Sequence, residues 1–187
     1  MSESVSPVLR EAAQVLRAGG VVAYPTEAVY GLGCDPCNEA ALRRLLKIKQ
    51  RPWQQGLIVI AADEGQLAPF LAPVEDAIWQ RVSASWPGPN TWVLPAKEGL
   101  SPLLIGEHDS IAVRVTAHPV AAALCRAFGG PIVSTSANLS GQPPARSVLE
   151  VRRQLNEAVD CIVAGPVDRQ ARPSTIRDAR SGQVLRG

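Results

Sequence analysis

The stretch SIAVRVTAHPVAAALCRAFGGPIVSTS, residues 110–136, decides the fold class. In residues 110–115 apolar side chains alternate with small or polar ones, which predicts a strand with one apolar face. A helix is expected over 118–128, because Gly129-Gly130 is a typical helix end. Residues 131–136 are expected to form another strand, which runs into a polar loop. A strand, a helix and a strand in this order indicate an α/β or α+β protein.

The same mixture of elements continues on both sides of this stretch. Ser6-Pro7 is a typical helix start, and the apolar residues after it recur at helical spacing until Gly19-Gly20. Further helices are expected over 39–48, 63–71, 74–86 and 148–155, and further strands over 21–24, 57–61 and 91–94, with short strands near Cys161 and Gln183. The chain has 187 residues, the size of one ordinary domain. We therefore expect a single domain over residues 1–187, with a mixed β-sheet flanked by helices.

The composition favours a folded protein of the cell interior. Apolar residues make up 46% and charged residues 19% of the chain, so a sizeable core is expected. No apolar run approaches the roughly 18 residues that a membrane span needs. The N-terminus is acidic and polar and lacks the basic segment of a secretory signal. The expected location is the cytoplasm, with no role for a membrane.

Basic residues are concentrated in two regions of an almost neutral chain, whose net charge is +2. Residues 139–187 carry eight basic and five acidic side chains, and residues 40–62 carry five basic ones and no acidic one. Such a run indicates a local basic patch. A solvated helix face explains part of it equally well.

Cys34 and Cys37 form a CxxC pair, but the sequence does not favour a metal site. A structural zinc site needs a second close pair, and Cys125 and Cys161 stand alone. We expect free thiols, as is usual in the cytosol, and no metal ligands from the protein.

Lys49 and Arg51 are candidate ligands for an anion. At 100° per residue, Lys49 lies on the same side of the helix over 39–48 as Leu42. An inward lysine is costly without a partner, so it should line an anion-binding cavity or extend out of it. Pro52 favours an extended Arg51, which would bring its guanidinium to the same ligand. A frayed helix end with both cations in water is the alternative.

The two strands of residues 110–136 provide the other candidates. Alternation places Ser110, Ala112 and Arg114 on one face, which predicts the floor of a polar cavity with Arg114 ready for a carboxylate or phosphate. A solvent-facing side is the alternative. Ser134 and Ser136 share a strand face, and the small polar residues after them offer hydroxyl and backbone donors. A locally hydrogen-bonded turn explains that segment as well.

These candidates are cations and hydroxyls without a visible protein nucleophile. The sequence has no GxxxxGK[ST] or GxSxG motif, and Gly31-Leu32-Gly33 is followed by Pro36 where a dinucleotide fingerprint needs a third glycine. Such a set suits phosphoryl or nucleotidyl transfer by positioning and charge stabilisation.

Six segments occur in the order and spacing typical of the YrdC/Sua5 family, and they span nearly the whole chain. They are YPTEAVYGLG (24–33), KQRP (49–52), PGPNT (87–91), VRV (113–115), STSANLSG (134–141) and PSTI (173–176). Each segment is weak by itself, but six in register make the chain resemble this family, in its short bacterial form. The resemblance implies a twisted, mixed α/β sheet around a large electropositive cavity.

The resemblance also implies an enzyme, a nucleotidyltransferase that converts L-threonine, bicarbonate and ATP into threonylcarbamoyl-adenylate and pyrophosphate. A tRNA threonylcarbamoyl-transferase complex would then transfer the threonylcarbamoyl group to adenosine 37 of tRNA, which gives the t6A modification. ATP is a substrate here, and Mg²⁺ is expected on its phosphates.

Motif by motif, the resemblance assigns residues to the two substrates. It implies ATP contacts from Lys49, Arg51, Ser110, Ser136 and Asn138, with Lys49 and Arg51 as the catalytic cations, and threonine contacts from Thr26, Arg114, Ser134 and Ser174. The chain also departs from the family pattern. Ala28 stands where many relatives have a threonine, and Ile60 where many have a histidine. Threonine recognition must therefore use other groups, such as the backbone.

Two other functions stay open at this point. The basic segment near Lys49 and the positive C-terminal region also fit a non-catalytic RNA-binding maturation factor, whose RNA affinity would fall strongly with salt. Weak tRNA or RNA binding is expected of the enzyme as well. Within the resemblance, hydrogenase-maturation relatives of this fold use carbamoyl phosphate in place of threonine.

Overall fold

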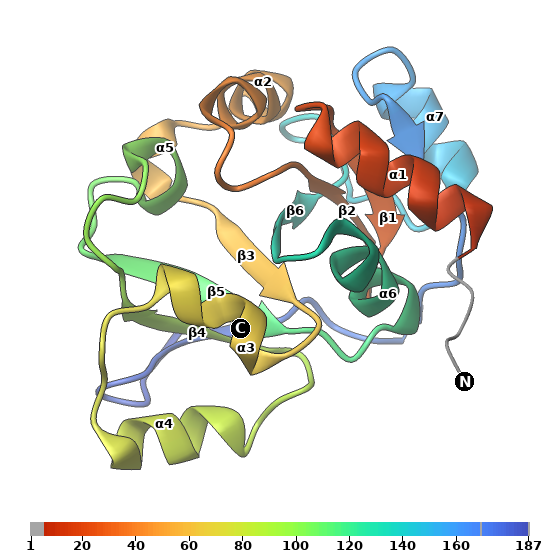
Figure 1. Cartoon of the computed structure of the whole chain (residues 1–187). Helices are drawn as coiled ribbons and strands as arrows, with labels where there is room; N and C mark the ends of the chain where they lie inside the picture. Colours follow the sequence, from red (N-terminus) through yellow and green to blue (C-terminus); the bar gives the residue numbers. More distant parts are fainter. Residues whose placement is uncertain (1–5, 169, 187) are drawn as a thin grey trace.

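The computed structural model describes residues 6–168 and 170–186 (Figure 1). The helices are α1 (Pro7–Arg17), α2 (Glu39–Lys49), α3 (Glu64–Leu67), α4 (Asp76–Ser83), α5 (Pro102–Ile105), α6 (Pro119–Phe128) and α7 (Val148–Leu155), with 3-10 turns η1 (Trp53–Gln55) and η2 (Ala68–Phe70). The strands are β1 (Val22–Pro25), β2 (Tyr30–Gly33), β3 (Ile58–Ala61), β4 (Asn90–Pro95), β5 (Ser110–Val115), β6 (Ile132–Ser136), β7 (Cys161–Ile162), β8 (Thr175–Asp178) and β9 (Val184–Arg186). Within these ranges no helix is long and apolar enough to cross a membrane.

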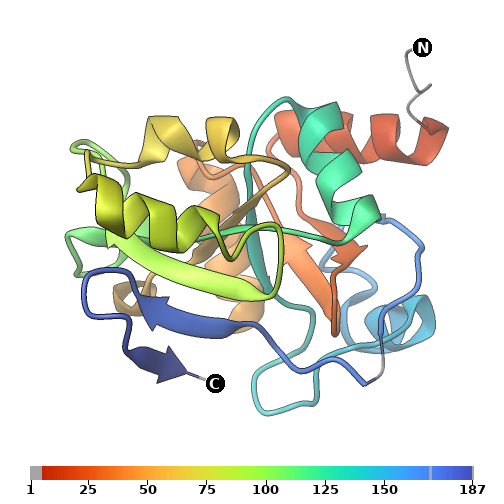
Figure 2. The same cartoon turned by 90° about the horizontal axis from the view of Figure 1, so that it is seen from below.

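The described strands form one nine-stranded sheet in the order β7-β1-β2-β6-β3-β5-β4-β8-β9. The pairs β1–β7, β3–β5 and β4–β8 are parallel, and the other pairs are antiparallel. The predicted mixed sheet flanked by helices is therefore confirmed. Strand β6 joins the two halves of the sheet, since it pairs with β2 on one side and β3 on the other. Seen from below (Figure 2), β8 and β9 extend the sheet beyond β4.

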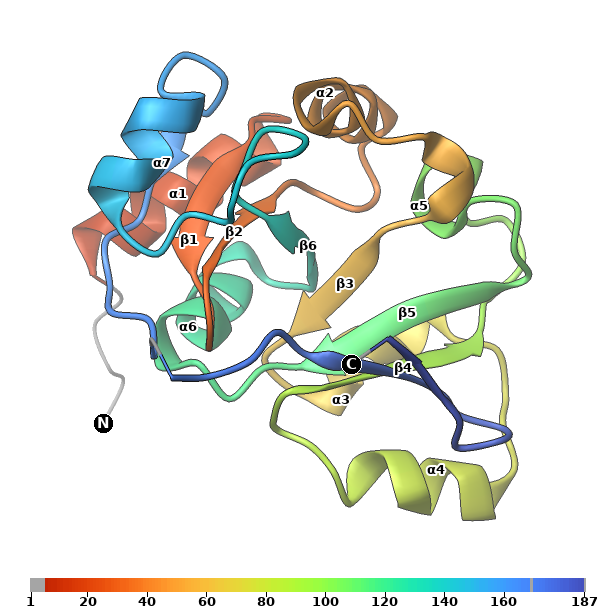
Figure 3. The ribbon, with the colours of Figure 1, turned by 180° about the vertical axis from the view of Figure 1, so that it is seen from behind.

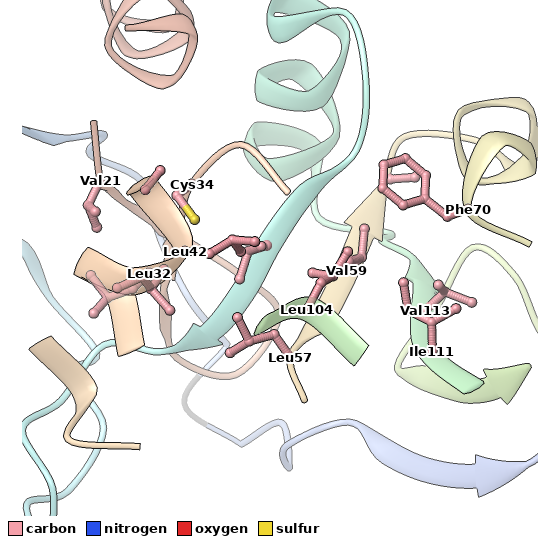
Figure 4. Packing of buried hydrophobic residues seen from close by; sticks show 14 of the residues in the cluster. Val21, Leu32, Cys34, Leu42, Leu57, Val59, Phe70, Leu104, Ile111 and Val113 are labelled. Carbon is pink, nitrogen blue, oxygen red and sulfur yellow. The ribbon is translucent and has the colours of Figure 1, made fainter. Parts of the chain in front are cut away.

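Helices cover both faces of the sheet. On one face, Leu42 of α2 and Leu104 of α5 pack with Val59 of β3 in the larger hydrophobic cluster (Figure 4). Successive strand residues point to opposite faces, so Ile60 of β3 and Ile132 of β6 lie on the second face. There they pack against α1 and α6, which lie side by side in Figure 1.

The second face is covered by helices only in part. Ser134 and Ser136 follow Ile132 on the same face of β6, and they line a cavity instead of packing against α1 and α6. Figure 3 shows the molecule from behind, where the C-terminal segment (blue) runs from the β1 edge, where β7 pairs, to the β4 edge, where β8 pairs. This segment contributes Ser174 and Ile176 to the cavity wall.

Strand β2 and the elements α5 and β8 were not predicted from the sequence. The sequence of β2 is Tyr-Gly-Leu-Gly, and glycine weakens strand propensity. The glycine at 33 is required by close packing: a Cβ there would lie 2.5 Å from the Val133 carbonyl oxygen and 2.8 Å from Cε1 of the Tyr24 ring. Gly33 therefore lowers the strand propensity of this segment, but no larger residue would fit at its place in β2.

Two predicted helices were too long. The expected helix over 63–71 ends as α3 at Leu67 and continues as the 3-10 turn η2, which contains Pro69. Proline lacks the backbone donor that a continuing α-helix needs. The expected helix over 74–86 shortens to α4, which begins at Asp76 and ends at Ser83.

Candidate active site

A cavity of about 490 Å³ opens on the partly uncovered face of the sheet. Its floor includes Ser110, Ala112 and Arg114 of β5, together with Ser134 and Ser136 of β6. The alternation in residues 110–115 predicted this polar floor, and the structure confirms it. Of the residues assigned to substrates from the sequence, those that line the cavity are Thr26, Arg51, Ser110, Arg114, Ser134, Ser136 and Ser174.

Lys49 lies on the inward side of α2 as predicted, and it is 8% exposed, but it does not line the cavity. Its Nζ donates to the Ser136 carbonyl, the Asn138 carbonyl and Asn138 Oδ1, each at 2.7 Å. Asn138 Oδ1 also accepts a hydrogen bond from Ser136 Oγ at 2.6 Å. Three protein oxygens thus satisfy this cation in the structure, and its contact with an anion stays a prediction.

Burial also changes the acidity of this lysine. Removal from water lowers the pKa of Lys49 from its ordinary 10.5 to about 8, and the nearby charge of Arg51 acts in the same direction. Asn138, like Lys49, is absent from the cavity wall and lies behind Ser136. Lys49 and Asn138 thus hold the end of β6 in place from behind.

Arg51 lies two residues after the end of α2 and faces the cavity. Its Nε donates to the Gly56 carbonyl at 3.2 Å, and its side chain lines the wall. Burial lowers the pKa of Arg51, and the charge of Arg186 lowers it further. Arg186 comes from β9, so the cavity brings together two cations that are far apart in the sequence. Arg172 is a further cation in the same wall.

Arg114 is paired with an acid inside the cavity. It is 6% exposed, and its Nη1 lies 2.6 Å from Glu27 Oε2. Burial raises the pKa of Glu27, but the charge of Arg114 and the hydrogen bonds that Glu27 accepts outweigh it, so the pKa of Glu27 lies below its ordinary value. Glu27 is thus a carboxylate, and Arg114 is not an isolated cation.

Thr26 and Ser134 face each other across Gly31. A Cβ on Gly31 would lie 3.3 Å from Thr26 Cγ2 and 3.4 Å from Ser134 Oγ, so a glycine here leaves the space between them open. Ser174 Oγ accepts a hydrogen bond from Thr91 Oγ1 at 3.1 Å. The wall near these hydroxyls is therefore fixed by neighbouring side chains.

The two departures from the family pattern lie in different surroundings. Ala28 lines the cavity, whereas Ile60 is fully buried against α1 and α6. Gln55 is also part of the wall. Position 60 in this chain therefore contributes to the core and offers nothing to a ligand.

Sequence reasoning missed several residues of the wall. Those with an ionisable side chain are Glu27, Tyr30, His108, Arg172, Asp178 and Arg186. Glu27 stands inside a segment that was singled out, but only its hydroxyl neighbour was assigned a role. The two arginines belong to the positive C-terminal region, whose excess charge was visible without any indication that it faces the cavity.

Most of the basic segment 40–62 is already neutralised or buried. Arg43 pairs with Glu39 at 3.3 Å, Arg44 pairs with Asp160 at 2.6 Å, and Lys49 is enclosed. These contacts reduce the local basic patch expected from the sequence, although Lys47 stays exposed. Cys34 and Cys125 are buried thiols, and burial raises the pKa of each to about 12. Across residues 6–168 and 170–186 no group of three or more His, Cys, Asp or Glu side chains is placed to hold a metal ion.

A mixed α/β sheet with a cavity lined by arginines and hydroxyls is typical of proteins that bind anionic substrates. The family model Sua5/YciO/YrdC, described as "Telomere recombination", matches residues 14–187, and the chain belongs to this family. The predicted family is thus confirmed.

Named relatives and solved structures agree with this placement. The threonylcarbamoyl-AMP synthase of Halorhodospira halophila is 58% identical over 178 residues, which cover 95% of this chain and 93% of that protein. The enzyme of the same name from Alkalilimnicola ehrlichii is 59% identical over 181 residues, with 95% and 94% covered.

Among solved structures, P. abyssi Sua5 complexed with L-threonine has a TM-score of 0.85 and 36% identity, and the match covers 91% of this chain and 50% of that one. The chain thus spans about half the length of that Sua5. E. coli YciO has a TM-score of 0.83 and 29% identity, with 95% and 87% covered.

Proposed function

We propose that this protein is a threonylcarbamoyl-AMP synthase, which forms threonylcarbamoyl-adenylate and pyrophosphate from L-threonine, bicarbonate and ATP. The observation that carries the proposal is the single cavity wall that joins Thr26, Arg114, Ser134 and Ser174 to Arg51, Ser110 and Ser136. It occurs in a chain 58% identical to a protein of that name.

Threonine would bind where the hydroxyls surround Arg114. The guanidinium of Arg114 would hold the threonine carboxylate, and Thr26, Ser134 and Ser174 would contact its other polar groups. ATP would lie toward Arg51, Ser110 and Ser136. In this arrangement Lys49 and Asn138 act through the backbone and side chain of Ser136, and Arg186 adds a cation for the phosphates.

The reaction needs no covalent bond to the protein. The threonine amine attacks bicarbonate to give an N-carboxylate and water. An oxygen of this carboxylate then attacks the α-phosphorus of ATP, the bond from that phosphorus to the β-phosphate breaks, and pyrophosphate leaves. Arg51 and Arg186 would offset the charge that collects on the departing oxygens.

Mg²⁺ would be held by the ATP phosphates more than by the protein. Of the two acids in the wall, Glu27 is engaged by Arg114 and Asp178 accepts hydrogen bonds from Ser181. When bound, the ion would neutralise phosphate charge.

The product is a reactive adenylate, so a protein that accepts the threonylcarbamoyl group must follow in the reaction sequence. We propose a tRNA threonylcarbamoyl-transferase complex as this partner, and the bacterial cytoplasm, where ATP and tRNA occur, as the location. The reduced basic patch around α2 favours the enzyme over an RNA-binding factor without catalysis.

The decisive experiment measures pyrophosphate release by the purified chain and the mass of the nucleotide product. We expect release that needs threonine, bicarbonate and ATP together, and a product with the mass of threonylcarbamoyl-AMP. Serine, glycine and carbamoyl phosphate are the comparison substrates. Release with carbamoyl phosphate instead of threonine, or RNA binding without any turnover, would overturn the proposal.

A further inference from the structure

We propose that Glu27 is a positioning residue, whose carboxylate holds the Arg114 guanidinium in the orientation in which it receives the carboxylate of the substrate. The identity of that substrate rests on the proposed function. The geometry of the pair stands independently of it.

The first observation is that Glu27 is itself fixed in place. Its Oε1 accepts hydrogen bonds from Thr116 Oγ1 at 2.9 Å and from the Ala117 backbone N–H at 3.0 Å. Both donors lie directly after β5, the strand that carries Arg114. Oε2 lies 2.6 Å from Arg114 Nη1 as an ion pair, and it has no hydrogen-bond partner among the described residues. One carboxylate thus links the end of β5 to the arginine side chain through a charge contact.

The second observation is that Glu27 occupies only part of the guanidinium. Within the described residues, Arg114 Nε is buried without an acceptor. A guanidinium has five N–H donors in a planar fork, and it can hold two carboxylates on different edges. Glu27 therefore contacts the guanidinium at Nη1, and Arg114 Nε stays without an acceptor among the described residues.

The third observation links this pair to the rest of the wall. The Glu27 carbonyl accepts a hydrogen bond from the Asp168 N–H at 2.9 Å, and the chain continues from there to Arg172 and Ser174 in the same wall. Charge neutralisation also matters, because an arginine this buried is costly without a partner. Glu27 thus makes a buried cation tolerable before the substrate arrives.

The test is Glu27→Gln, which keeps the shape and the acceptor toward Thr116 but loses the charge and faces Arg114 with a donor. We expect the KM for threonine to rise about tenfold or more, while the KM for ATP changes less than about twofold. Glu27→Asp, which keeps the charge, should recover part of the loss. Glu39→Gln is the matched control, since it breaks an exposed glutamate–arginine pair outside the cavity and should leave both KM values unchanged. Equal rises in both KM values, or none, would overturn the proposal.

A second measurement does not depend on turnover. The ¹⁵N–¹H NMR signal of Arg114 Nε–H, assigned by its loss in Arg114→Lys, reports how firmly the side chain is held. We expect its exchange with water to be at least about tenfold faster in Glu27→Gln than in the wild type. Unchanged exchange would overturn the positioning role. A wild type with a protected Arg114 signal but no threonine-dependent turnover would instead refute the proposed function alone.

Discussion

At the scale of single residues, Lys49 shows how a buried cation is satisfied by oxygens of its own chain. It holds Ser136 and Asn138 through three oxygens at 2.7 Å. Helical periodicity predicted that Lys49 points inward, because 100° per residue fixes the side of the helix. Its partners could not be predicted, since they come from residues almost 90 positions away and no local pattern encodes such a contact.

The lowered pKa of Lys49 gives a prediction about stability. The unfolded chain, in which this lysine has its ordinary pKa of 10.5, binds more protons than the folded chain between pH 8 and pH 10.5. The contribution of Lys49 to the free energy of unfolding is therefore complete above pH 10.5 and is lost as the pH falls through 8.

Chemical denaturation of the wild type and Lys49→Met checks this prediction. We expect the difference between their free energies of unfolding to shift in favour of the wild type by about 1–2 kcal/mol from about pH 7.5 to about pH 9.5. Lys47→Met, which removes an exposed lysine from the same helix, is the control. A flat difference, or an equal slope in the control, would contradict the shifted pKa.

At the scale of elements, the site is built from segments that the sequence presents far apart. Residues 110–115 and 131–136 could be predicted as strands with polar faces, because strand alternation determines which side chains share a face. The hairpin of β8 and β9 was largely missed, since its strands are short and β9 is exposed. The pairing of β8 with β4 is what brings Ser174 and Arg186 to the wall.

We therefore expect the β8–β9 hairpin to contribute to ATP binding through Arg186. Arg186→Met should raise the KM for ATP about tenfold, because a cation beside Arg51 is lost, and should leave the KM for threonine unchanged. Arg180→Met changes an exposed arginine of the same hairpin that does not line the cavity. Steady-state kinetics on both variants distinguish a ligand contact from a general effect on the hairpin, which would affect both substrates or both variants.

At the scale of the whole molecule, the cavity lies where the helical cover of one face ends. Helices α1 and α6 pack on the part of this face that holds Ile132 and Ile60. They do not cover Ser134, Ser136 and Arg114, which line the cavity. The fold class could be predicted from the order of strands and helices along the sequence. The order of the strands within the sheet could not, because it depends on contacts between residues far apart in the chain. Motif spacing located Thr26, Arg51 and Ser174 in the wall, whereas the place of Glu27 and Arg186 in it emerged only from the assembled sheet.

Two substrate regions in one cavity should stabilise the protein separately. At about 100 times its Kd, ATP or threonine should raise the melting temperature by roughly 5–10 °C for a chain of this size. Arg51→Met should lose the ATP shift and keep the threonine shift, and Arg114→Met should do the reverse, each measured against its own ligand-free value. Arg43→Met, at an exposed surface pair, should keep both shifts. Loss of the same shift in both cavity variants would mean that the two regions are not distinct.

The central place of β6 has a consequence for the nascent chain. Strands β2 and β3 are made early, and although β2 pairs with β1 and β3 with β5, one edge of each finds its partner only in residues 132–136. Until the ribosome has released that segment, both strands have open edges that a strand of a neighbouring polypeptide can join. The interval between the synthesis of Ala61 and that of Ile132 is thus the period in which newly made copies are most prone to aggregate.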